Sequence, residues 1–351
     1  MNPLQKDNNI PTPIKSIWLP SLFLFRLSGL YSKKQNKRYQ VALAVLFNVA
    51  TLWVMAFKIF CVSQTLKWGT VFSAIIKVIP LILWWLVRLR MKKILSLVKK
   101  LDFFGEEIST RERISKFSKM VTVGAISLIF LQSVIRILII TISSPVCIYR
   151  ELISISKRNR VIIYILDEVF NRYPVAIIIL TVVSFFATYC YTLSVALQGK
   201  HYTSKTQAFL VCERTLQIFR ELENVFSPLI LLVFSHIVFD FLRIMFIIVF
   251  TIRYHQSIYL LSTFLNFITE IMLMVSTVLA ADKVQLIAND YRISLFTFYK
   301  TQDGINSCGE CATFYEDRER LRRTGWAMFI TRKPLLLSLS AWLFAYGVIL
   351  L

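Results

Sequence analysis

Ionisable side chains inside strongly apolar stretches are the residues of this sequence best placed for chemistry. His236, Asp240 and Arg243 are spaced i, i+4 and i+7, which puts all three on one face of a helix. An unpaired ion in hydrocarbon is costly, so this face is expected to look into a helical bundle. We expect an internal Asp240–Arg243 ion pair that satisfies itself, or else a polar wall of a ligand pocket or a gating contact.

Two further charged residues lie in other apolar stretches. Glu270 is expected near the depth of Asp240, counting about 1.5 Å of helical rise per residue. If the two helices adjoin, Glu270 is a candidate partner for Arg243; the alternative is a protonated or water-bridged carboxyl group without a ligand role. Arg136 is a candidate pocket residue, and its alternative role is to reach toward the outer lipid headgroups.

Aromatic residues near the ends of the apolar stretches offer a second set of pocket candidates. Tyr and Trp in such places more often anchor a helix at the membrane interface than bind a ligand. We place Tyr189 among the pocket residues. The candidates considered are Trp84, Trp85, Tyr189, Tyr191, Tyr254 and Tyr259.

A Cys-x-x-Cys pair at Cys308 and Cys311 is the motif most suggestive of a metal. A zinc site needs about four ligands, and no second such pair or neighbouring histidine accompanies it. The sequence also lacks a Ser-His-Asp arrangement, a phosphate-binding glycine loop and a metalloprotease motif. We therefore expect no catalytic residue, no metal and no cofactor, and a protein that is not an enzyme.

The elements that position these residues are predicted to be transmembrane helices. Of the 351 residues, 56% are hydrophobic and 17% are charged, which argues against a soluble globular protein. Seven segments are near the roughly 20 apolar residues that a helical crossing needs. They lie at 41–65, 69–87, 120–142, 175–198, 227–250, 257–281 and 334–351.

The fold class predicted is an all-α membrane protein of seven transmembrane helices. A cytoplasmic tail, 1–40, precedes the transmembrane domain, 41–351, whose cytoplasmic loops are 88–119, 199–226 and 282–333. Of the 41 Lys and Arg residues, 30 fall in the tail and these three loops, 7 on the other side and 4 within spans. By the positive-inside rule the N-terminus is cytoplasmic and the C-terminus extracellular.

The same distribution of charge bears on the function classes. The net charge is +21, but it follows every second loop, so we expect no nucleic-acid partner. A G-protein-coupled receptor has the opposite orientation, and neither Asp-Arg-Tyr after the third span nor Asn-Pro-x-x-Tyr in the seventh is present. A transporter usually shows paired repeats and broken helices, which we do not find.

Three stretches, together with the topology, resemble the insect gustatory receptor family, a branch of the insect chemoreceptor superfamily. Residues 25–31 (FRLSGLY) are similar to the family's segment before the first span, and residues 216–232 (LQIFRELENVFSPLILL) to its approach to the fifth. Near the C-terminus, a charged helix at 316–323 precedes an apolar helix containing Tyr346. Ala345-Tyr346 stands for the family's Thr-Tyr, whereas its closing Gln and Phe are absent.

The resemblance implies a ligand-gated cation channel subunit in the plasma membrane, which senses a small-molecule tastant. It implies a homo- or hetero-tetramer of receptor subunits among membrane lipids, with a ligand pocket in the outer half of each bundle. The seventh helix would line the pore, with Ser338, Leu339, Trp342 and Tyr346 as the pore-helix residues. The missing Gln and Phe favour an alternative, a receptor-like member that keeps the fold without conducting alone.

Overall fold

The computed structural model is all-helical over the residues that it describes. These are residues 22–30, 37–65, 68–102, 108–142, 173–198, 205–253 and 258–303, with Ser338, Ala341 and Ala345 near the C-terminus. The long helices are α2 (Lys37–Thr65), α3 (Trp68–Asp102), α4 (Ile108–Ile142), α6 (Tyr173–Gln198), α7 (Lys205–Arg253) and α8 (Ile258–Asp303). A short helix at 22–27 precedes them.

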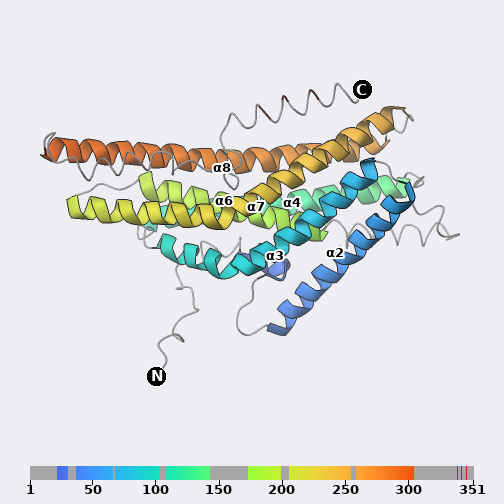
Figure 1. Ribbon diagram of the computed structural model, residues 1–351, viewed down its shortest axis with the longest axis horizontal. Helices are drawn as coiled ribbons and strands as arrows, with labels where there is room; N and C mark the ends of the chain where they lie inside the picture. The colour runs from blue at the N-terminus through green and yellow to red at the C-terminus, as the bar shows by residue number, and fades with distance from the viewer. Residues whose placement is uncertain are drawn as a thin grey trace.

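The first six predicted spans coincide with the six long helices, but several helices continue well past the span ends. The predicted cytoplasmic loops contain helical residues 88–102, 108–119, 205–226 and 282–303. At about 1.5 Å per residue, the 49-residue α7 and the 46-residue α8 are each roughly 70 Å long. Figure 1 shows both running along most of the molecule. A bilayer core is only about 30 Å thick, so these helices extend beyond any membrane they cross.

Four of the described helices are long and apolar enough to cross a membrane. The qualifying segments are Glu112–Ile135, Val175–Val195, Gln217–Val249 and Thr263–Ile287. The α6 segment is 83% buried inside the protein, against 33–39% for the other three. A helix that is apolar on every side belongs at the centre of a bundle. Accordingly α6 contacts α2, α3, α4, α7 and α8.

The segment 22–30 packs into this bundle. The Phe25 ring meets Phe185 of α6 edge to face, with ring centroids 5.1 Å apart. The indole N–H of Trp84 donates a hydrogen bond to the Ser28 carbonyl at 2.8 Å. Trp84 is therefore a core residue with its polar atom satisfied, and not an anchor at the membrane interface.

Gly29 explains why this segment turns so tightly against α2. Its φ of +71° lies in the left-handed region, which side chains disfavour. A Cβ atom at this position would lie 2.9 Å from the backbone nitrogen of Ala44. Glycine is required here both for the backbone angle and for the close approach of the two chain segments.

A proline within α7 removes one backbone hydrogen bond of the helix, and a side chain of α3 supplies the missing donor. Pro228 has no N–H, so the carbonyl of Asn224 loses its usual helical donor four residues ahead. The guanidinium of Arg90 donates hydrogen bonds to the carbonyls of Asn224 and Val225, the second at 3.0 Å. Half-burial lowers the pKa of Arg90 from its usual value, but an arginine stays protonated at neutral pH.

Candidate functional site: a buried ion pair and an apolar groove

The Asp240–Arg243 ion pair predicted from their spacing is present in α7. The Arg243 Nε donates to Asp240 Oδ1 at 2.7 Å, and an Nη of the same guanidinium lies 2.5 Å from that oxygen. The Asp240 side chain is 5% exposed and that of Arg243 is 22% exposed. The pair thus satisfies a charge that would be costly to bury alone.

The ion pair belongs to a larger polar cluster between α7 and α3. His236 is buried one turn before Asp240, on the face that the spacing predicted. Lys77 of α3 is half-buried and lies within electrostatic reach of both His236 and Asp240. We call these four residues, Lys77, His236, Asp240 and Arg243, the polar cluster.

The other predicted pocket residues are spread over different elements. Glu270 is buried on α8, and Arg243 is paired with Asp240 on its own helix. Tyr189 of α6 is fully buried, with its ring 6.2 Å from that of Phe226. Arg136 lies within α4, and its side chain is outside the described part of the structure. The ligand role of Arg136, Tyr189, Asp240, Arg243 and Glu270 stays a prediction.

The predicted pore-helix residues and the Cys-x-x-Cys pair lie mostly outside the described residues. Ser338 is helical and exposed. Leu339, Trp342 and Tyr346 lie outside the described residues, and so do Cys308, Cys311 and Tyr254. Tyr259 lies within α8, and its side chain is outside the described part of the structure. The pore role of the seventh span is therefore still an expectation from the family resemblance.

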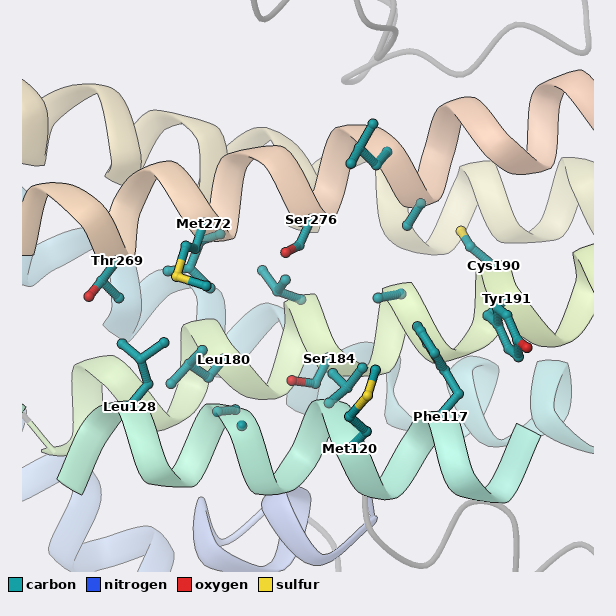
Figure 2. Close-up of a pocket in the computed structure, with 18 of the residues that line it drawn as sticks. Phe117, Met120, Leu128, Leu180, Ser184, Cys190, Tyr191, Thr269, Met272 and Ser276 are labelled. Carbon is teal, nitrogen blue, oxygen red and sulfur yellow. The ribbon is translucent and has the colours of Figure 1, made fainter. Parts of the chain in front are cut away.

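An elongated apolar groove of about 540 Å³ runs between α4, α6 and α8. Its volume lies within the range of small-molecule sites, roughly 300–1,000 Å³. In Figure 2, Leu128 and Met120 of α4 and Met272 and Ser276 of α8 lie on opposite sides, with Leu180 and Ser184 of α6 between them. We call this the α4–α6–α8 groove. None of the five predicted pocket residues lines it.

The two ends of the groove differ in chemistry. At one end the Phe117 ring stacks on that of Tyr191 with centroids 4.1 Å apart, and Lys283 Nζ lies 5.2 Å from the Tyr191 centroid. At the other end the Gln132 side-chain amide donates to the Thr269 hydroxyl and to the Leu265 carbonyl, the latter at 3.4 Å. One end is therefore cationic and the other is closed by a neutral α4–α8 contact.

The groove was missed by the sequence reasoning, because apolar residues on three distant helices look like ordinary core. Of the aromatic candidates considered, Tyr191 lines it, and Gly124 is a second local signal. A Cβ atom built at Gly124 would meet nothing within 4 Å, so the helix has open space there. Most glycines in helices carry no such meaning, and only the packing of α4 against α6 and α8 identifies this one.

Comparison with known proteins finds similar solved structures but no matching sequence family. No protein-family model and no curated protein matches the sequence. The structure is similar to the insect olfactory receptor OR5 from Machilis hrabei, with a TM-score of 0.67 and 12% identity. The same receptor in complex with eugenol gives a TM-score of 0.69, also at 12% identity. Each match covers 96% of this chain and 97% of the receptor chain.

At 12% identity the likeness establishes the fold alone. The predicted all-helical membrane fold is thus supported, while membership of the chemoreceptor superfamily and of its gustatory branch stays a prediction. Over its described residues the chain has an all-helical fold similar to that of an insect olfactory receptor, with four helices long and apolar enough to cross a membrane.

Proposed function

We propose that the protein is a chemoreceptor subunit of a ligand-gated cation channel that senses a small molecule. The observation that supports this most strongly is the full-length likeness to an olfactory receptor, one of whose structures contains eugenol. The three stretches that resemble gustatory receptors favour a tastant as the ligand. The assembly proposed is a homo- or hetero-tetramer in the plasma membrane.

The polar cluster on α7 and α3 supports a ligand pocket deep in the bundle. A ligand that accepts hydrogen bonds from Arg243 or Lys77 would compete with Asp240 for these cations. Such a ligand shifts the channel toward its open state only through a higher affinity for that state. Rearrangement of the Asp240–Arg243 pair is one source of this difference, because a buried charge strongly prefers a state in which it is paired.

The seventh span supplies the pore in this proposal. Leu339, Trp342 and Tyr346 share one helical face with a spacing of i, i+3 and i+7. A lining of this composition gates by dewetting and offers little selectivity, because polar groups are scarce. We therefore expect weak selectivity among cations, unless a partner subunit contributes a polar ring.

Current recording from cells that express the chain tests this function. The panel of compounds comprises sugars, bitter alkaloids and aromatic odorants including eugenol, applied to cells with the chain alone and with candidate co-receptors. Surface labelling must first show that the protein reaches the plasma membrane. A ligand-evoked cation current supports the proposal, and the compound that evokes it identifies the branch. Surface protein that gives no current with any compound or partner would count against it.

Cysteine substitution along 335–351 tests the pore. A thiol reagent applied during the evoked current should modify positions on the face of Leu339, Trp342 and Tyr346 faster than their neighbours. A robust current without modification at any position would mean that another helix lines the pore.

A further inference from the structure

We propose that the α4–α6–α8 groove binds one acyl chain of an anionic membrane lipid, with the headgroup at Lys283. This site is distinct from the ligand pocket of the proposed function. Its argument stands whether or not the chain conducts, because it rests on the shape, exposure and charge of the groove.

The shape of the groove suits a chain better than a compact molecule. On α8 the lining runs from Thr269 to Lys283, a separation of 14 residues and about 21 Å of helix. Along this length the side chains are mostly aliphatic, aromatic or sulfur-containing. The Thr269 hydroxyl donates to the Leu265 carbonyl at 2.8 Å, so it does not demand a polar partner from a guest. A long apolar chain would fill this space without leaving buried polar groups unsatisfied.

The groove opens toward the side of the bundle, where lipid tails are the surrounding solvent. Its floor is α6, of which Leu180, Val183 and Cys190 are buried. Its rim is exposed: Met120 of α4 is 67% exposed and Met272 of α8 is 51% exposed. The rim residues lie inside the segments Glu112–Ile135 and Thr263–Ile287, which are apolar enough to cross a membrane. An opening at this depth meets hydrocarbon, so a bilayer lipid is the occupant present in greatest excess.

The charge at one end of the groove sets the orientation of the lipid. Lys283 lies above the Tyr191 ring and is exposed, so its ammonium is available to a headgroup. On α4, Lys119 follows the lining residue Phe117 by two positions and is also exposed, whereas Lys116 is paired with Glu112 at 2.9 Å. Basic side chains near a membrane surface attract anionic headgroups. In the predicted topology this end faces the cytoplasm, whose leaflet carries the anionic lipids.

Two variants of α4 test the acyl-chain site. Gly124→Trp introduces a bulky side chain where a Cβ meets open space, so it should fill the groove without disturbing the bundle. Val123→Trp adds a similar side chain at the neighbouring position, which is 62% exposed and does not line the groove. Gly124→Leu is a smaller filling variant in case the tryptophan impairs folding.

The probe is phosphatidylglycerol with a photoreactive diazirine on one acyl chain, compared with the phosphatidylcholine analogue. The full chain is purified, placed in nanodiscs that contain one probe or the other, irradiated and mapped by peptide mass spectrometry. We expect labelling of 117–128 and 269–283. In Gly124→Trp this labelling should fall about tenfold, because the tryptophan side chain would occupy the space that the acyl chain needs. Val123→Trp should label as the wild type does.

Lys283 provides the test of the headgroup. Lys283→Gln should lower the preference for the anionic probe over the zwitterionic one by about fivefold. Lys283→Arg should restore this preference, and Lys93→Gln, at an exposed position of α3, should leave it unchanged.

Three results would overturn the proposal. The first is labelling confined to peptides outside the groove. The second is equal labelling of the groove in Gly124→Trp, Gly124→Leu and Val123→Trp. The third is a groove that excludes both lipid probes but is protected from a thiol reagent at a Ser276→Cys variant by the channel's activating compound. That last result would assign the groove to the soluble ligand, and it leaves the proposed receptor function standing.

Discussion

Arg90 is predicted to stabilise the protein mainly by donating a hydrogen bond to the Asn224 carbonyl, which has no helical donor because residue 228 is a proline. The test is the variant Arg90→Gln, made in the wild-type chain and in a Pro228→Ala chain. Alanine at position 228 supplies the missing N–H to Asn224, so the helix no longer needs the guanidinium there. The cost of losing Arg90 should therefore depend on the residue at 228.

The structure gives the expected size of this effect. A hydrogen bond to a charged group contributes roughly 1.5–3 kcal/mol, and Arg90 donates to two carbonyls in a half-buried site. We expect Arg90→Gln to cost about 2 kcal/mol in the wild type and about 1 kcal/mol with Pro228→Ala. A second charged contact between α3 and α7, Lys100 with Glu221, is partly exposed and contributes less than about 1 kcal/mol. Arg90 should thus contribute more than Lys100 to the contact between the two helices.

The assay is an equilibrium unfolding titration of the purified chain in mixed detergent micelles, arranged as a double-mutant cycle. Lys92→Gln removes an exposed positive charge two residues away and is the matched control. A coupling energy of about 1 kcal/mol between positions 90 and 228 exceeds the usual additivity error of about 0.5 kcal/mol. If Arg90→Gln costs the same on both backgrounds, the guanidinium does not compensate for the proline and the reasoning is wrong.

The remaining predictions concern the ion pair, the tight turn and the topology. Arg243→Ala should destabilise the fold by about 3 kcal/mol, because it leaves the Asp240 charge buried without its partner. The double variant Arg243→Gln with Asp240→Asn removes both charges and should cost less, and surface expression and unfolding titrations measure both effects. Gly29→Ala should cost about 2 kcal/mol or more from its positive φ and its approach to Ala44, measured as a lower melting temperature. An epitope tag at Met1 should stain only after permeabilisation of the cells, and staining of intact cells would refute the assigned orientation.

Local spacing predicted some features of the candidate site correctly. Asp240 and Arg243 are three residues apart on an apolar helix, so their pairing follows from helical geometry without knowledge of the neighbouring helices. The six long helices were likewise predictable, because each contains one of the long apolar stretches read from the sequence, and four of them are apolar enough to cross a membrane. The helical continuations at 205–226 and 282–303 were not, since hydropathy decides where a chain leaves the membrane and not where its helix ends.

Tertiary packing determines which side chains face the core and where the groove lies, neither of which could be predicted from the sequence. Trp84 and Trp85 are adjacent and chemically identical, yet Trp84 is 1% exposed and Trp85 is 49% exposed. A helix turns by about 100° per residue, so the two rings face different surroundings. Which of them faces the core depends on the segment 22–30, whose Ser28 carbonyl accepts the Trp84 hydrogen bond. The α4–α6–α8 groove is similarly set by the fit of three helices and has no sequence motif of its own.

The central claim, that the chain forms a ligand-gated cation channel, is tested most directly with the purified protein in a planar lipid bilayer. The activating compound identified in cells is added while the sodium on one side is replaced by the large cation N-methyl-D-glucamine. The account predicts discrete channel openings only in the presence of the compound, with a current carried by sodium that falls on replacement. Purified, folded protein that binds the compound but never opens a conductance, alone or with its partner subunit, would contradict it.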